Sequence, residues 1–293
     1  MTPLISPQEL RRLPSKDLVL LDATTLLPGD SFDAEQRFRR THIPGARRFD
    51  IDAFSDPEGG LPHMVPSQGR FARLIGALGI GRDSHVVCYD HAGLAGAARC
   101  WWLLGLFGHD RVQVLDGGLL AWQAALLPVE SGEATAVPPA VFLPSLRAER
   151  LVGLGDMIAI AAGERQAVVV DARSRARFEG AAPEPRPGLP GGHIPGSASL
   201  PFGELLAPDQ RLLPRDVLRE RFAAAGIDGS QPVVTSCGSG LTASVLSLGL
   251  ATAGFAQGAM FDGSWTEWAS HPELPRETSP ELSRQLPHAG AAA

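Results

Sequence analysis

The sequence has little cysteine, and it contains neither a long apolar run nor a basic run. Three cysteines in 293 residues are an odd, low number, which argues against a disulfide framework and fits a reducing compartment. The net charge is −6 and no stretch is strongly basic, so we expect neither nucleic acid nor a membrane as a partner. No apolar run approaches the roughly 20 residues of a membrane span. Residues 1–10 lack the pattern of a signal peptide, and we expect a cytoplasmic protein.

The chain repeats itself with an offset of about 146 to 151 residues. Four motifs occur twice in the same order: Asp22-Ala23-Thr24 and Asp171-Ala172-Arg173, His42-Ile43-Pro44-Gly45 and His193-Ile194-Pro195-Gly196, Val86 to Asp90 and Val233 to Cys237, and Leu115-Asp116-Gly117 and Phe261-Asp262-Gly263. Chance matches would not keep this order, so the sequence indicates a tandem duplication.

Composition divides the chain into three parts. Residues 131–145 are rich in Pro, Ala and Val and show no period, which is typical of an extended linker. We therefore expect an N-terminal domain over residues 1–130 and a C-terminal domain over residues 146–293. The end of the chain, from Ser279 to Ala293, has few core-forming residues and is expected to be loosely ordered.

Short apolar runs alternate with helical patterns in both copies, which predicts an α/β fold with a parallel sheet covered on both faces in each domain. The expected strands are Leu18–Asp22, His85–Tyr89, Val112–Leu115, Ala167–Asp171, Pro232–Ser236 and Ala259–Phe261. The expected helices include Ser67–Leu78, Ala95–Leu106, Arg215–Ala225 and Leu241–Ala253, with Gly79 and Gly254 suited to helix C-termini. Ligands bind such folds beyond the carboxyl ends of the strands.

Cys237 lies at such a place, at the start of the loop Cys237-Gly238-Ser239-Gly240-Leu241-Thr242. Two glycines permit unusual φ values and let backbone N–H groups turn inward. The following helix adds partial positive charge. Such a cradle favours a nucleophilic thiolate and can also hold the charge of a persulfide. The alternative is a buried, inert cysteine, which is how we interpret Cys88 and Cys100.

The first copy has Asp90 where the second has Cys237. A carboxylate carries no transferable sulfur, so we expect the first domain to be catalytically silent and structural, although it can line the site. Cysteine phosphatases place an arginine six residues after their cysteine, where it grips phosphate bidentately. Here that position is Ala243, which argues against phosphatase chemistry.

These motifs resemble those of the tandem rhodanese family, and within it the 3-mercaptopyruvate sulfurtransferases. The resemblance covers nearly the whole chain and is most specific in the loop, which reads Cys-Gly-Ser-Gly-Val-Thr-Ala in mercaptopyruvate enzymes. This chain differs only at Leu241, a mild apolar change. Thiosulfate-preferring relatives carry basic residues after the cysteine, whereas Gly238 and Ser239 are uncharged.

The resemblance implies two substrate arginines, Arg177 and Arg186. An arginine fork matches a carboxylate better than lysine does; the alternative is two solvated surface charges. Arg173 and Arg175 match no such role and are expected at the surface. The resemblance also implies a polar relay of Asp52, His63 and Ser239, which we expect to serve proton transfer.

Asp52 and His63 have a second interpretation, in which they only join the two domains. His42 and His193 precede Pro-Gly turns and are interpreted as structural. Thr242 is expected to cap the following helix, with assistance to the cradle of the loop as the alternative. Gly238, Gly240, Leu241 and Thr242 are expected to bind substrate through the loop backbone.

The expected function is transfer of sulfur from 3-mercaptopyruvate to a thiol or cyanide through a persulfide on Cys237, with release of pyruvate. Two alternatives stay open: a thiosulfate:cyanide sulfurtransferase, and a non-enzymatic sulfur carrier or regulatory protein. The acceptor is left open among thioredoxin, glutathione, cyanide and a dedicated carrier. No metal-binding spacing and no phosphate-binding loop is visible in the sequence, so we expect no cofactor and no metal.

Overall fold

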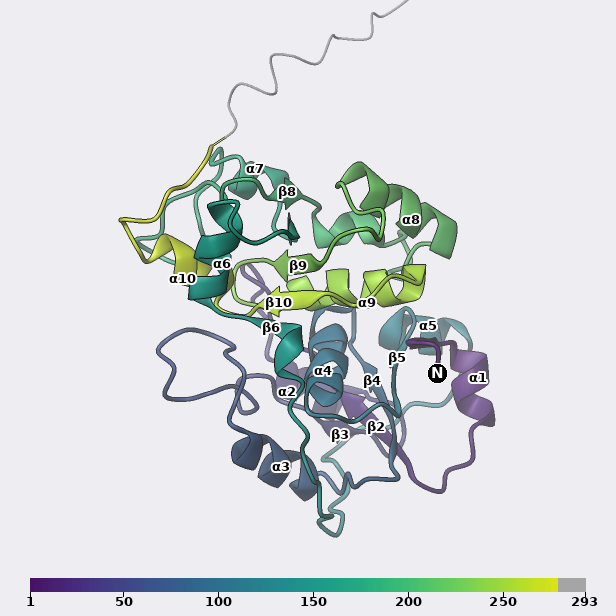
Figure 1. The fold of residues 1–293 in the computed structure, drawn as a ribbon. Coiled ribbons are helices and arrows are strands. Elements are labelled where there is room, and N and C mark those ends of the chain that lie inside the picture. The colour runs from purple at the N-terminus through teal and green to yellow at the C-terminus, as the bar shows by residue number, and fades with distance from the viewer. Residues whose placement is uncertain (279–293) are drawn as a thin grey trace, which may run out of the picture.

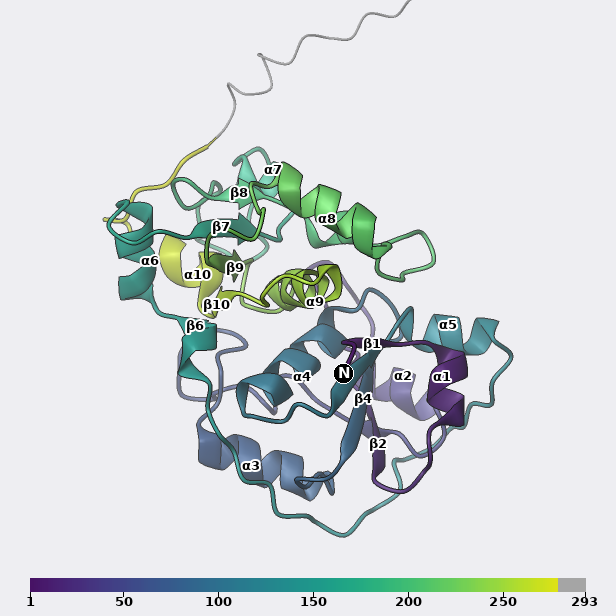
Figure 2. The same cartoon turned by 45° about the vertical axis from the view of Figure 1, so that its right-hand side comes forward.

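The computed structural model describes residues 1–278, which form two open parallel sheets flanked by helices (Figures 1 and 2). The first sheet has the strand order β1-β5-β4-β2-β3, and the second has the order β6-β10-β9-β7-β8. The two orders correspond strand by strand, so the duplication predicted from the sequence is seen as a repeated topology. The predicted fold class is confirmed. The tail from Ser279 to Ala293, expected to be loosely ordered, lies outside the described residues.

The strands of the two sheets are short, and the edge strands are the shortest. The first sheet contains β1 (Leu4–Ile5), β2 (Leu18–Asp22), β3 (Arg47–Arg48), β4 (His85–Tyr89) and β5 (Val112–Leu115). The second contains β6 (Leu151–Val152), β7 (Val168–Asp171), β8 (Ala198–Ser199), β9 (Val233–Ser236) and β10 (Ala259–Phe261). All six strands predicted from the sequence are present, with starts that differ by at most one residue.

Helices cover both faces of each sheet. Around the first sheet lie α1 (Pro7–Arg12), α2 (Ala34–Arg40), α3 (Gln68–Ala77), α4 (Ala95–Leu106) and α5 (Gly118–Ala124). Around the second lie α6 (Leu154–Ala161), α7 (Arg175–Phe178), α8 (Arg215–Ala224), α9 (Ala243–Ala253) and α10 (Ser264–Ala269), with short 3-10 helices at Ala148–Arg150 and Phe202–Leu205.

The side chains of β4 point alternately into the two hydrophobic cores, one on each face of the first sheet. Val86 and Cys88 belong to the core that includes α3 and α4, whereas Val87 and Tyr89 belong to the core that includes residues of α1, α2 and α5. Successive side chains of a strand point to opposite faces. Since both faces are covered by helices, the whole strand is apolar rather than alternating with polar residues.

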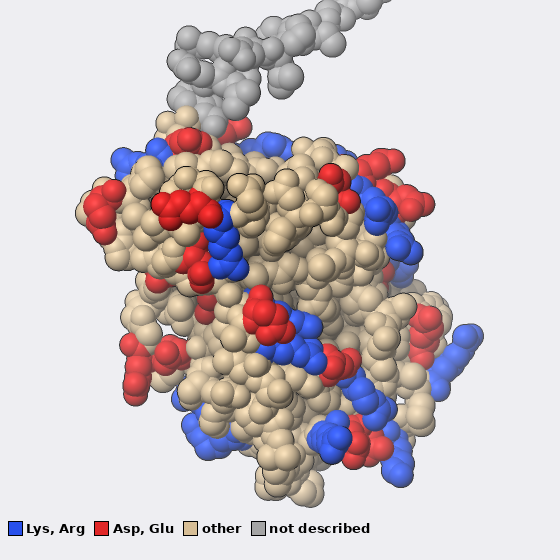
Figure 3. Space-filling model, viewed as in Figure 1, with Lys and Arg blue, Asp and Glu red and all other residues tan. Residues whose placement is uncertain are grey.

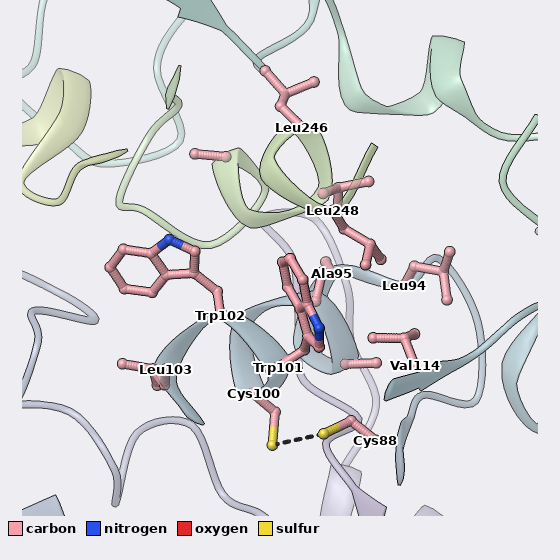
Figure 4. Packing of buried hydrophobic residues seen from close by; sticks show 14 of the residues in the cluster. Cys88, Leu94, Ala95, Cys100, Trp101, Trp102, Leu103, Val114, Leu246 and Leu248 are labelled. Atoms are coloured by element: carbon pink, nitrogen blue, oxygen red, sulfur yellow. Dashed lines mark hydrogen bonds between the residues drawn. The ribbon is translucent and has the colours of Figure 1, made fainter. Parts of the chain in front are cut away.

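The two halves join through α4 and α9, the helices that follow the Asp90 and Cys237 loops (Figure 4). Trp101 and Ala95 on α4 face Leu248 on α9, and one buried cluster runs through both halves. All residues of α4 are buried, as expected of a helix that is apolar on every side apart from a single charged residue, Arg99.

Cys88 and Cys100 lie inside this cluster, on β4 and α4. Both are fully buried, and their sulfur atoms are 3.2 Å apart (Figure 4). Burial raises the pKa of the Cys100 thiol well above its usual value, and Cys88 raises it further. The prediction that these two cysteines are core residues is confirmed.

His42 and His193 occupy matching places in the two halves. Each Nδ1 lies 2.8 Å from a backbone carbonyl, that of Phe38 or Phe178, and each ring stacks on the same phenylalanine. These contacts fix the chain before each Pro-Gly turn and support the structural role that we expect for both histidines.

Residues 131–145 contain neither helix nor strand. Phe142 is buried, and its ring meets Phe71 of α3 edge-on at 5.7 Å. Backbone bonds from Gly132 to Arg39 and from Ala140 to Gly76 attach the segment to the first half. The bounds 1–130, 131–145 and 146–293 for two domains and a linker stay a prediction.

Candidate active site

Cys237 is the first residue after β9, and α9 begins at Ala243. Its side chain is buried, with 1% of the residue's surface exposed. The helix was expected to begin at Leu241, but Leu241 and Thr242 belong to the loop. Thr242 has helical backbone angles and makes no side-chain capping bond, so the prediction that it caps the helix is wrong.

The backbone of the loop leaves several donors free. Within the described part of the chain, four amides donate to no other protein group: those of Gly238, Ser239, Leu241 and Thr242. The amides of Cys237 and Gly240 instead donate to the Oγ of Ser264, each at 3.1 Å. Uncommitted amides beside a thiol can stabilise negative charge on sulfur.

The two loop glycines serve different purposes. Gly240 has φ +77°, and a Cβ there would lie 3.0 Å from the carbonyl oxygen of Asp262. Gly238 is not in the left-handed region, so the expectation of an unusual φ is wrong for it. A Cβ at Gly238 would instead lie 3.2 Å from Nη2 of Arg177. Gly238 therefore makes room for an arginine.

Helix α10 holds the loop from behind. Ser264 Oγ accepts the two loop amides and donates to the carbonyl of Phe261 at 2.8 Å. The hydroxyl of Thr266 donates to the carbonyl of Gly238 at 2.6 Å, and the amide of Trp265 donates to the carbonyl of Cys237 at 2.9 Å. The carbonyls of Cys237 and Gly238 are thereby tied to α10.

Arg177 is fixed by a buried carboxylate. Its Nη2 lies 2.5 Å from Oε2 of Glu184, and its Nε lies 3.2 Å from Oε1. Nη1 of Arg173 donates to the same Oε1 at 2.7 Å. The Glu184 side chain is only 2% exposed. Glu184 thus bridges two arginines.

Arg173 was expected at the surface, and that prediction is wrong. Its side chain is fully buried and donates to both carboxylate oxygens of Asp171, to Glu184 and to the carbonyl of Gly192. A buried arginine needs such partners because an unpaired buried charge is costly. Arg175, by contrast, is exposed and pairs with Glu204, as expected of a surface residue.

Arg186 lies on the other side of Gly238, where a Cβ would be 3.7 Å from its Nη1. This Nη1 donates to the Oγ of Thr266 at 3.4 Å. Burial lowers the pKa of Arg186, whereas the nearby Cys237 acts in the opposite direction. No carboxylate among residues 1–278 lies within 4.0 Å of this guanidinium. The predicted pair Arg177 and Arg186 is therefore assembled next to the cysteine loop.

The structure also brings Asp52, His63 and Ser239 together. His63 Nδ1 lies 2.8 Å from Oγ of Ser239, and its Nε2 lies 3.4 Å from Oδ1 of Asp52. Burial lowers the pKa of His63, and Arg99 and Arg186 lower it further, against Asp52 and Asp262. A neutral ring with its proton on Nε2 accepts a hydrogen bond from the Ser239 hydroxyl.

Arg99 of α4 ties this histidine to the cysteine loop. Its Nη2 donates to the carbonyl of His63 at 2.6 Å and to Oδ1 of Asp262 at 2.8 Å, while its Nη1 donates to the carbonyl of Gly240 at 3.3 Å. The other oxygen of Asp262 accepts the amide of Val65 at 2.6 Å. A buried ion pair between the two halves thus sets the position of both segments.

These residues surround a cleft of about 490 Å³ between the two halves. Cys237, Arg177 and Arg186 line it from the second half, and His63 and residues 26–28 line it from the first. A larger cavity, of about 630 Å³, lies at the matching end of the first sheet and is lined by Asp90. We place the reactive site in the smaller cleft because it alone of these two is lined by a cysteine.

The structure also bears on metal binding, on membrane insertion and on surface charge. No group of three or more His, Cys, Asp or Glu within residues 1–278 is arranged to hold a metal ion. No helix in that part of the chain is long and apolar enough to span a membrane. Acidic and basic side chains are interspersed on the face of the molecule shown in Figure 3.

Sequence reasoning missed several residues that shape the site: Arg99, Arg173, Glu184, Asp262, Ser264 and Thr266. The repeated Asp-Gly motif was a signal for Asp262 and Ser264, because it marks a turn kept in both copies. Glu184 had a weaker signal, since it stands in the same short segment as Arg186. Arg99, within an apolar helix pattern, was an unexplained charge that required a buried partner.

Comparison with known proteins agrees with this geometry. The family model for the rhodanese-like domain matches residues 6–125 and again residues 158–271. The chain is 39% identical over 262 residues to the 3-mercaptopyruvate sulfurtransferase of Escherichia coli (strain K12), covering 89% of this chain and 92% of that one. It is 39% identical over 282 residues to a mitochondrial thiosulfate/3-mercaptopyruvate sulfurtransferase of Arabidopsis thaliana, covering 89% of this chain and 74% of that one.

Solved structures give the same result. The crystal structure of SseA from Escherichia coli, described as showing the fold and mechanism of 3-mercaptopyruvate sulfotransferases, matches with a TM-score of 0.82 and 34% identity. The match covers 90% of this chain and 99% of that one. Two parallel α/β units with a cysteine loop between strand and helix define the class of protein. The chain belongs to the rhodanese family, in its tandem form, and the resemblance seen in the sequence is confirmed.

Proposed function

We propose that the protein is a 3-mercaptopyruvate sulfurtransferase that carries sulfur as a persulfide on Cys237. The observation that carries this proposal is the pair Arg177 and Arg186 on either side of Gly238, next to a buried cysteine with free backbone amides. The curated relatives from Escherichia coli and, at 41% identity over 253 residues, Homo sapiens are 3-mercaptopyruvate sulfurtransferases, which supports the assignment.

In the first half-reaction, the Cys237 thiolate attacks the sulfur of 3-mercaptopyruvate. The new S–S bond forms as the C–S bond breaks, and the electron pair of that bond passes to carbon as the enolate of pyruvate. Arg186 and Arg177 hold the carboxylate and keto oxygen, and the free loop amides stabilise the charge on sulfur. A proton must then reach the enolate carbon to give pyruvate.

We propose that the relay of Asp52, His63 and Ser239 delivers this proton to the enolate. The Ser239 hydroxyl lies on the cysteine loop and contacts His63, whose lowered pKa keeps it neutral at neutral pH. A hydroxyl hydrogen-bonded to a neutral imidazole can both give and regain a proton. We therefore assign the relay to proton transfer, with Asp52 orienting the ring.

In the second half-reaction, a thiolate or cyanide attacks the outer sulfur of the persulfide. The S–S bond breaks and its electron pair returns to Cys237, which regenerates the thiolate. The cycle is complete without a dissociable cofactor. We assign the sulfur-carrying step to the second domain alone, because Asp90 cannot take part in sulfur exchange. We also propose a cytoplasmic location and a small-molecule donor.

The donor assignment is tested by two rate measurements on one preparation. Pyruvate release from 3-mercaptopyruvate is compared with thiocyanate formation from thiosulfate and cyanide. A higher kcat/KM for 3-mercaptopyruvate is expected. A higher value for thiosulfate would overturn the assignment in favour of the thiosulfate:cyanide alternative, to which the name of the Arabidopsis thaliana relative also points. A complete lack of both activities would favour a non-enzymatic sulfur carrier.

A further inference from the structure

The charge of the cleft that contains Cys237 depends on more residues than the two proposed substrate arginines. Three arginines line the cleft: Arg173, Arg177 and Arg186. Two buried carboxylates contact them, Asp171 at Arg173 and Glu184 at both Arg173 and Arg177. The group therefore has one net positive charge. The neighbouring His63 adds none at neutral pH, because its pKa is lowered by burial and by Arg99 and Arg186.

That positive charge is unevenly placed. Arg173 is surrounded by carboxylates, and Arg177 has Glu184 along one edge of its guanidinium. Arg186 has no carboxylate within 4.0 Å in residues 1–278, and its hydrogen bond to Thr266 is long, at 3.4 Å. Among the three arginines, Arg186 thus offers an incoming anion the guanidinium with no carboxylate of the described residues in contact, while Cys237 and Glu184 act on its charge through space.

We infer that Glu184 is a specificity-determining residue, which matches the cleft to donors with one negative charge and disfavours dianions. The inference rests on the proposed function, since it concerns the choice between two donors of one site. Glu184 lies behind Arg177 and is 2% exposed, so it acts through the arginines rather than by touching substrate. Because it is shielded from water, its charge is screened less than a surface charge would be.

The distinction between donors follows from their charges. 3-Mercaptopyruvate brings one carboxylate, whereas thiosulfate brings two negative charges into the same cleft. The carboxylate of Glu184 repels a dianion more strongly than a monoanion, because the repulsion is proportional to the charge of the ligand. A neutral side chain of the same shape at position 184 removes that opposition and leaves the fork of Arg186 intact.

The test is Glu184→Gln, with kcat/KM measured for both donors on the same preparation. The ratio of the thiosulfate value to the 3-mercaptopyruvate value is expected to rise by about tenfold. Sulfate and acetate, as inert competing anions, give the same comparison without chemistry: the inhibition constant of sulfate should fall relative to that of acetate. Equal losses for both donors, with an unchanged ratio, would show that Glu184 only holds Arg177 in place and would overturn the inference.

Two further variants serve as controls. Glu204→Gln removes a carboxylate from another arginine pair, Arg175–Glu204, whose arginine is 55% exposed. It should leave the ratio unchanged, and a rise there would mean that general charge rather than Glu184 sets the preference. Glu184→Asp keeps the charge but shortens the side chain, so its ratio should stay near that of the unaltered protein even if both rates fall. A wild-type preference for thiosulfate would instead count against the proposed function.

Discussion

His63 and Ser239 come from different halves of the chain, 176 residues apart, and their side chains meet at 2.8 Å. His63 itself has φ +61°, an uncommon value for a histidine, and its carbonyl is held by Arg99. The first half has Asp90 in place of a reactive cysteine, yet it supplies the imidazole of His63 to the cysteine loop of the second half. This contact joins the two halves and brings the His63 ring to the cysteine loop, as the proposed proton transfer requires.

The proton relay predicts a specific pH dependence. The pKa of His63 is lowered by burial, and Asp52 opposes that shift. Asp52→Asn removes the opposing charge, so the pKa of His63 should fall further and the acid limb of kcat should move to lower pH. Because Asp52 is 82% exposed, solvent screens its charge and the shift should be small. A shift toward higher pH would show that another group controls the acid limb.

Arg186 should be needed for its fork rather than for its charge alone. Arg186→Lys keeps the positive charge but loses the planar, bidentate geometry that suits a carboxylate. The KM for 3-mercaptopyruvate should rise by about tenfold, as expected for loss of a charged hydrogen bond, whereas the KM for thiosulfate should change little. Arg175→Lys, outside the cleft, provides the control. Similar increases for both donors would leave Arg186 no special role toward the carboxylate.

The Arg99–Asp262 pair should matter for stability. Arg99→Met leaves Asp262 with a buried, unpaired charge, which should lower the free energy of unfolding by about 3–5 kcal/mol. Adding Asp262→Asn removes that charge while keeping an acceptor for the amide of Val65. Urea unfolding should therefore show the double variant to be more stable than Arg99→Met alone. Additive losses would mean that the two side chains are not coupled.

Asp90 should be a source of instability that depends on pH. Burial raises its pKa well above the ordinary value, Asp22 raises it further, and its Oδ1 has no hydrogen-bond partner in residues 1–278. The pKa of Asp90 is higher in the folded than in the unfolded chain. The free energy of unfolding therefore falls as the pH rises between these two pKa values. Asp90→Asn should raise Tm by a few degrees at neutral pH, and the gain should vanish near the unfolded pKa of 3.8. A gain independent of pH would exclude this cause.

Much of the architecture was predictable because the strands and the duplication leave local patterns. β2, β4, β5 and α4 have the predicted bounds, since continuous apolar runs end at clear turn residues. The edge strands β1, β3, β6 and β8 were missed. Each has two residues, too few for any periodicity, and each exists because a neighbouring strand offers a free edge.

The site was predictable only where a motif carried it. Cys237, Arg177, Arg186 and the group around His63 lie together as the resemblance implied. The buried charged residues that contact these groups could not be predicted from the sequence, because the pairing of charges is a property of the folded chain. Arg173 shows the reason: exposure of arginine is the usual outcome, and only the nearby Asp171 and Glu184 make its burial favourable.

The central claim is that sulfur travels on Cys237. Incubating the protein with 3-mercaptopyruvate, in the absence of an acceptor, should release pyruvate in an amount equal to the protein. Mass spectrometry of the digested chain should then find the mass of an added sulfur atom on the peptide containing Cys237, and cyanide should remove it as thiocyanate. Cys237→Ser should lose both signals, whereas Cys88→Ser should keep them. Pyruvate release by Cys237→Ser, or the added sulfur on Cys88 or Cys100, would contradict the account.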